Sequence, residues 1–154
     1  MALSKQTIRD DLTAAMKARE ADLTATLRML LAAVGNAEVA GKEQVLLSHD
    51  QIVSVVRAET KKRTDAAAMY TDAQRPELAE KELAEAKILA RYLPAEITEA
   101  ALTAVVSEAV AAAASSGQVG PKAMGSVMKL VKDKLGSSVD GNRMAAAVKA
   151  ALVP

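Results

Sequence analysis

Apolar residues recur at intervals of three and four along nearly the whole chain, the spacing that places side chains on one face of an α-helix. Alternating apolar and polar residues, the mark of a strand, are hard to find. A first helix is expected to begin after Ser4, a good N-cap residue, and a second to open near Asp22 and end before Gly41. Nothing between Arg19 and Leu23 forces a break, so these segments could also be one bent helix. The expected inward-facing residues are Ile8, Leu12, Ala15, Met16, Leu23, Leu27, Leu30, Leu31 and Val34.

Two longer helices follow. Ser48 and Gln51 have the spacing of a capping box, in which each side chain bonds the backbone N–H of the other residue. This helix is expected to run to about Tyr70. Pro76 suits the first turn of the next helix, because its missing N–H has no partner there anyway. That helix should end before Pro94, since the residue preceding a proline is disfavoured in the α conformation.

The composition changes at Pro94, where we place a domain boundary between residues 1–94 and 95–154. The first part holds 14 Lys and Arg against 14 Asp and Glu, whereas the second holds 6 against 5 and is richer in Ala and Val. The second part reads as three short helices, with Thr98 capping the first, Gly120-Pro121 opening the second and Asp140 capping the third. We therefore predict an all-α protein with a larger N-terminal multi-helix domain and a small C-terminal three-helix bundle.

The composition also excludes several kinds of chemistry. The 154 residues include no Cys, a single His and two Tyr as the aromatic residues, so disulfides, thiol chemistry and Cys-based zinc sites are excluded. His49 lies in a cap sequence and is expected to be an exposed loop residue. We predict no catalytic residue, no metal site and no cofactor. No apolar run reaches the roughly 18 residues of a membrane span, and no signal-type segment follows Met1, so a cytoplasmic protein without membrane contact is expected.

Two groups of cations are candidates for contact with nucleic acid. The first is a helix face in the N-terminal part, which could bind phosphates. The alternative is a solvated face paired with Glu59, Asp65 or acids of the next helix. The members of this group are Arg57, Lys61, Lys62 and Arg63.

The second group lies in the C-terminal part. From residue 122 onward six basic residues face two acidic ones, whereas residues 95–121 carry three acids and no base. Such a polarised domain is a reasonable surface for tRNA or another phosphate-bearing partner. Because it lacks aromatic residues for stacking on bases, contact is expected to follow shape and backbone. The members are Lys122, Lys129, Lys132, Lys134, Arg143 and Lys149.

Several ordered segments resemble the YqeY-like family, the stand-alone form of the GatB/YqeY domain. They begin with Ala15-Met16-Lys17-Ala18-Arg19 and Thr26-Leu27-Arg28, followed by Lys62-Arg63 with Asp65 and by the stretch from Arg75 to Glu82. Tyr92-Leu93-Pro94, Met124-Gly125 and Asp140-Gly141 complete the set, which covers nearly the whole chain. Some cationic positions of the family are occupied here by Ala21, Leu23, Ser126 and Ser137. The positions taken as structural motifs are Lys17, Arg28, Glu82, Pro94, Gly125, Asp140 and Gly141.

The resemblance implies a two-part helical fold related to the C-terminal region of the B subunit of tRNA-dependent amidotransferases. That region contacts tRNA, while the chemistry lies elsewhere in those enzymes. Three hypotheses follow. The protein is a non-catalytic module that contacts tRNA or another structured RNA, or it is a protein–protein adaptor. The third hypothesis is an accessory in glutamine-dependent amidation, a carbon–nitrogen ligation, with amidotransferase or synthetase subunits as partners. Arg28 interrupts an apolar run and is expected to pair with an acid between Glu77 and Glu85.

Overall fold

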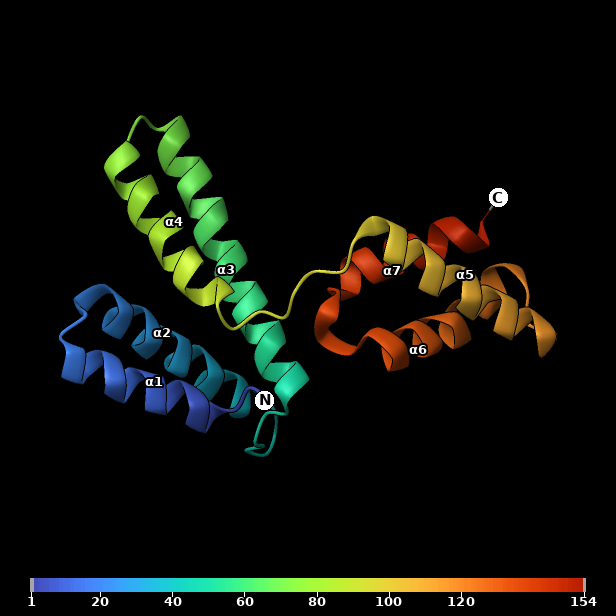
Figure 1. Ribbon diagram of the computed structural model, residues 1–154, viewed down its shortest axis with the longest axis horizontal. Helices are drawn as coiled ribbons and strands as arrows, with labels where there is room; N and C mark the ends of the chain where they lie inside the picture. Colours follow the sequence, from blue (N-terminus) through green and yellow to red (C-terminus); the bar gives the residue numbers. More distant parts are fainter. Residues whose placement is uncertain (1, 154) are drawn as a thin grey trace. The chain divides into compact units, whose positions relative to one another are not determined.

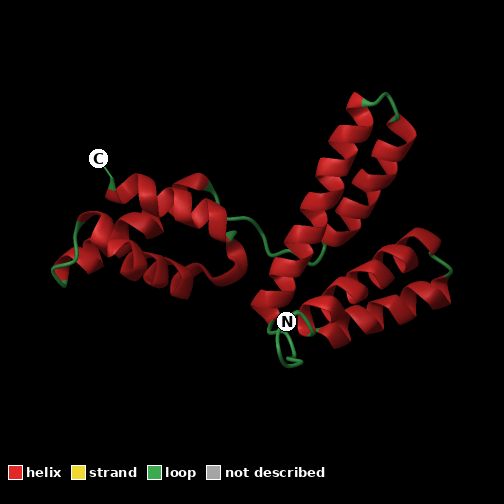
Figure 2. Cartoon of the chain, turned by 180° about the vertical axis from the view of Figure 1, so that it is seen from behind, coloured by secondary structure: helices red, strands yellow, loops and turns green. Residues whose placement is uncertain are grey.

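A computed structural model describes residues 2–153, and within that range every regular element is helical. Residues 2–153 form seven α-helices and two short 3-10 helices, joined by turns. Figures 1 and 2 show the helices along the chain. The prediction of an all-α protein is confirmed. The elements are α1 (Lys5–Ala18), α2 (Ala21–Glu38), α3 (His49–Asp72), α4 (Pro76–Ala90), α5 (Glu99–Ser115), η1 (Gly120–Ala123), α6 (Met124–Leu135), η2 (Gly136–Ser138) and α7 (Gly141–Leu152).

The chain divides into two compact units, Met1–Leu93 and Pro94–Pro154, which we call unit 1 and unit 2. Unit 1 contains α1 to α4, arranged as two helical hairpins (Figure 1). Unit 2 contains α5, α6 and α7. The division into an N-terminal helical domain, residues 1–94, and a C-terminal three-helix domain, residues 95–154, stays a prediction.

The helix starts follow the capping signals in the sequence. The Ser4 hydroxyl accepts from the Thr7 backbone N–H, and Ser48 and Gln51 form both bonds of the predicted capping box. In unit 2 the Thr98 and Asp140 side chains accept backbone N–H groups at the starts of α5 and α7. Each cap satisfies a donor that the first helical turn leaves unpaired, so these helix starts were readable from sequence.

Both hairpins of unit 1 turn at a non-glycine residue in the left-handed conformation. Arg19 follows α1 with φ 57°, and Gln74 follows α3 with the same φ. After α1, the N–H groups of Arg19 and Glu20 bond back to the carbonyls of Met16 and Ala15. This pattern is a Schellman motif, which ends a helix sharply and is more often built on glycine. The alternative of a single bent helix across residues 19–23 is therefore wrong.

The interior of unit 1 collects aliphatic residues from all four helices, and several predicted inward positions differ. Met16, expected to face inward, is exposed, because the apolar stripe of α1 is wider than the surface this helix buries. Leu83 of α4 is exposed as well. Leu12, Leu23 and Leu31 lie at the edge of the core. The fully buried members are Ile8, Leu27, Leu30, Val34, Ile52, Val53, Val56 and Leu89.

A buried ionic cluster joins α3 to α4. Arg63 is 5% exposed, and its guanidinium donates to Glu59 at 2.8 Å and to Glu85 of α4 at 3.1 Å. It also donates to the Glu59 carbonyl at 3.0 Å. The interface beside it is built from small residues such as Ala67, Ala79 and Ala86. Alanine faces let two helices pack closely but bury little apolar area, so the arginine cluster contributes to both alignment and stability.

The start of the chain is fastened to the beginning of α3. The Leu3 backbone N–H donates to His49 Nδ1 at 2.7 Å, so His49 is an acceptor and is half-buried rather than an exposed loop residue. Lys5 pairs with the buried carboxylate of Glu38. These two contacts hold the N-terminal segment across the ends of α2 and α3.

Unit 2 has its own core, formed where α5, α6 and α7 meet. Its buried residues include Leu102, Val106, Val127, Val131 and Val148. Gly136, with φ 52°, ends α6 in a conformation that side chains rarely adopt.

No single helix within residues 2–153 has the length and apolar composition needed to cross a membrane. The segments Glu99–Ser115 and Gly120–Ser138 meet that test only when taken together, and the chain bends by 102° between them. Their apolar residues form the core of unit 2, which accounts for their composition.

Replacing Glu85 with alanine is expected to lower the free energy of unfolding by about 2 kcal/mol, because Arg63 then stays buried with one charged acceptor fewer. Urea unfolding followed by circular dichroism measures the change. Arg75→Ala, which removes the exposed pair between Arg75 and Glu77, should leave the urea midpoint nearly unchanged. Equal effects of the two variants would contradict the role assigned to the buried cluster.

The same cluster predicts a pH dependence. Burial alone raises the pKa of Glu59, but hydrogen bonds and charge from Lys62 and Arg63 outweigh it and lower the pKa below the ordinary 4.5. The Glu59 carboxylate therefore binds a proton less readily in the folded chain than in the unfolded chain. Its ionised form stabilises the fold above the pKa of the unfolded chain, and this stabilisation is lost as the pH falls through the lower pKa of the folded chain. Stability should fall from about pH 6 to about pH 3 more steeply in the native protein than in Glu59→Gln. Parallel stability curves would count against this linkage.

Candidate nucleic-acid interface

Three of the four cations in the first candidate group are paired with acids of unit 1. Lys61 pairs with Asp65 at 2.6 Å, and Lys62 pairs with Glu59 at 2.6 Å. Arg63 is buried in the cluster described above, and Arg57 is half-buried. For Lys61, Lys62 and Arg63 the structure shows the paired arrangement that the sequence offered as the alternative to phosphate binding.

In unit 2, two of the six candidate cations are held by acids of α5. Lys134 pairs with Glu108, and Arg143 donates to Glu99 at 2.7 Å. Arg143 also donates to the Ile97 carbonyl at 2.9 Å, so this side chain fastens α7 to the segment before α5. The acids of α5 thus neutralise one part of the basic tail.

The other four cations are exposed and have no ion pair among residues 2–153. We call these residues, Lys122, Lys129, Lys132 and Lys149, the open lysines. Lys129 and Lys132 lie one turn apart on α6, away from the residues it buries. Lys149 of α7 lines a small hollow with Pro121 of η1, the 3-10 helix that also carries Lys122. Positive charge is therefore concentrated on η1, α6 and α7.

The family-motif positions have mainly structural surroundings. Asp140 caps α7, Gly141 is the first residue of that helix and Gly125 lies in the first turn of α6. Pro94 follows unit 1, Glu82 is half-buried on α4, and Lys17 is exposed in the last turn of α1. These positions mark helix starts, helix ends and packing seams.

Arg28 differs from its expected role. It is exposed, and its guanidinium lies 3.8 Å from the Met16 sulfur of α1. Glu85 of α4, one of its expected partners, is bound instead by Arg63. The expected pairing of Arg28 with an α4 acid is therefore wrong, because the periodicity of α2 did not reveal which arginine reaches the seam.

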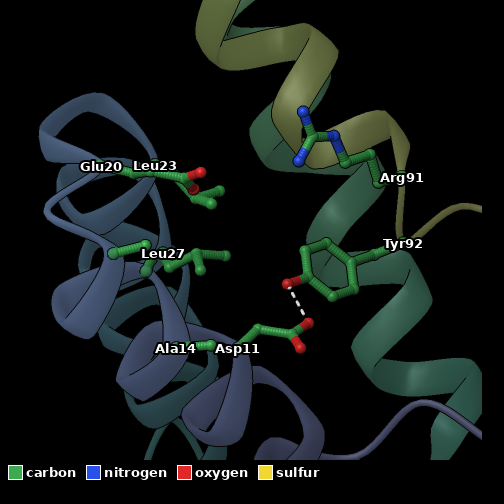
Figure 3. A pocket seen from close by; sticks show the side chains of 9 residues that line it. Asp11, Ala14, Glu20, Leu23, Leu27, Arg91 and Tyr92 are labelled. Carbon is green, nitrogen blue, oxygen red and sulfur yellow. Dashed lines mark hydrogen bonds between the residues drawn. The ribbon is translucent and has the colours of Figure 1, made fainter.

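Unit 1 also contains a groove that no sequence pattern predicts, which we call the Tyr92 groove. It encloses about 410 Å³ between α1, α2 and the end of α4. Its lining residues include Asp11, Glu20, Leu27, Arg91 and Tyr92 (Figure 3). Tyr92 belongs to the family motif Tyr92-Leu93-Pro94, which is the one mark of this site in the sequence. The residues that face it are distant in sequence and carried no such mark.

Tyr92 fixes one wall of this groove. Its hydroxyl donates to Asp11 Oδ2 at 2.5 Å, a bond between residues 81 positions apart. Burial raises the pKa of Tyr92, and the Asp11 carboxylate raises it further. The phenol therefore remains a proton donor at neutral pH, and the bond to Asp11 persists.

Metal-ligating side chains do not gather anywhere in the part of the chain that the structure describes. Within residues 2–153 no group of three or more His, Asp or Glu side chains could hold a metal ion. His49 uses its Nδ1 atom to accept the Leu3 N–H.

Comparison with known families accounts for the ordered motifs. The family model described as Yqey-like protein matches residues 5–152, which covers nearly the whole chain and includes parts of both units. A search of curated proteins finds no match. The resemblance drawn from the separated motifs is confirmed: the chain belongs to the YqeY-like protein family.

Proposed function

We propose that the protein is a non-catalytic module that contacts structured RNA through the open lysines of unit 2, with tRNA as the RNA that the family resemblance implies. The observation that carries this proposal is their lack of ion pairs among residues 2–153, while Lys134 and Arg143 are held by acids. A cation without an intramolecular partner can approach a phosphate without first breaking an ion pair.

Charge and composition favour contact with the RNA backbone. Both tyrosines, Tyr70 and Tyr92, belong to unit 1, so unit 2 has no aromatic ring on which a base could stack. Four lysines spread over η1, α6 and α7 suit phosphates along a folded RNA better than the bases of a single strand. Recognition would then follow the shape of the RNA, as expected for a tRNA body.

The family resemblance implies a relation to tRNA-dependent amidotransferases. The protein would bring RNA to an amidotransferase or synthetase partner and perform no chemistry itself. Copurification of such subunits with the tagged protein supports an accessory role in glutamine-dependent amidation. Unchanged amidation of aminoacyl-tRNA after deletion of the protein opposes that role without bearing on RNA binding.

The double variant Lys129→Gln/Lys132→Gln tests the interface. Four phosphate contacts predict a slope of about −3 for the logarithm of tRNA affinity against the logarithm of salt concentration, and two contacts predict about −1.5. We expect the native protein near the first value and the variant near the second, measured by fluorescence anisotropy with labelled bulk tRNA between about 50 and about 200 mM salt.

The matched control is Lys81→Gln/Lys87→Gln, which removes the same charge from exposed positions of α4 in unit 1. It should retain the native slope. No binding of tRNA by the native protein at low salt would overturn the proposal. An equal loss in both variants would show that net charge, rather than this face, determines the affinity.

A further inference from the structure

The Tyr92 groove brings opposite charges together above an apolar floor. Glu20 and Asp11 lie on the side formed by α1 and α2, and Arg91 and Tyr92 extend from the opposite side, where α4 ends (Figure 3). The ion pairs within residues 2–153 include neither Glu20 nor Arg91. Both charges therefore remain available to a ligand.

The floor of the groove is aliphatic. Leu27 is fully buried, Leu23 is half-buried, and alanines of α1 complete the lining. Its volume of about 410 Å³ falls within the range of small-molecule sites. A floor of this kind favours a ligand with an apolar portion, while the charges at the rim fix the orientation of its polar ends.

The bond between Tyr92 and Asp11 joins the two walls at one end of the groove (Figure 3). The same bond ties α1 to the end of α4 and so sets the width of the groove. At the other end, the left-handed turn at Arg19 places Glu20 on the rim. A preorganised rim lowers the entropy lost when a small ligand binds.

From these features we infer that the Tyr92 groove binds a small zwitterion, with its ammonium group at Glu20, its carboxylate at Arg91 and an aliphatic side chain over Leu23 and Leu27. A free aliphatic amino acid and a short aliphatic peptide share this chemistry. The site lies in unit 1, so it is separate from the RNA contact proposed for unit 2 and does not depend on it.

Titration of the 15N-labelled full-length protein with L-leucine and with L-leucyl-L-leucine tests the inference. We expect saturable shifts of the Leu23, Leu27 and Tyr92 amide signals, with a Kd of about 1 mM or below for at least one of the two. The probe that binds more tightly shows whether the groove prefers a free amino acid or a short peptide. Absence of saturable shifts at these amides with both probes would overturn the proposal.

Single-charge analogues separate zwitterion recognition from general affinity for one charge. Isoamylamine keeps the ammonium and the aliphatic group of leucine, and 4-methylpentanoate keeps the carboxylate and the aliphatic group. Each should bind at least about tenfold more weakly than the preferred zwitterion, because each leaves one side of the rim without a partner. Equal affinity of either analogue would refute the two-sided arrangement.

Three variants assign the charges. Arg91→Gln should weaken binding of the zwitterion about tenfold and leave binding of isoamylamine nearly unchanged. Glu20→Gln should also weaken binding of the zwitterion about tenfold, but it should leave binding of 4-methylpentanoate nearly unchanged. Arg9→Gln is the matched control, because Arg9 is exposed on α1 and outside the groove lining. The urea midpoint of each variant shows that it remains folded. Loss of zwitterion binding in Arg9→Gln equal to that in Arg91→Gln would contradict the assignment.

Discussion

The buried pairing of Arg63 with Glu59 and Glu85 is the constraint on which unit 1 depends. The alanine faces of α3 and α4 bury little apolar area, so they define the register of the two helices only weakly. The guanidinium supplies direction as well as energy, since each donor must meet its carboxylate in a fixed geometry. By aligning α4 on α3, it also places the end of α4, with Arg91 and Tyr92, beside α1 and α2.

Unit 2 is organised by a different distribution of charge. Its acids lie mainly on α5 and its bases on the elements that follow, and ion pairs join the two groups at Lys134 and Arg143. These pairs are partly exposed and contribute little to stability, but they remove two cations from the surface available to a partner. The remaining lysines define the basic face, which net charge alone could not have located.

The sequence was sufficient to predict where helices begin, because a helix start depends on local chemistry. Ser4, Ser48, Thr98 and Asp140 cap the predicted helices because a cap needs only residues within one turn. The left-handed turn at Arg19 was not readable, since glycine would be its usual signal. Contacts between helices were also beyond the sequence. The periodicity of α2 favoured Arg28 as the seam arginine, and the bond between Tyr92 and Asp11 joins segments that no pattern connects.

The length of chain between Asp11 and Tyr92 has a consequence for folding. Within each hairpin the helices are neighbours in sequence, so their pairing requires only short loops to close and should form early. The contact from Tyr92 back to Asp11 closes a loop of 81 positions and carries a larger entropic cost. During synthesis the Tyr92 groove cannot exist until residue 92 has left the ribosome, long after α1 and α2 can pair. The groove is therefore expected to form late in folding, after the helices of each hairpin have paired.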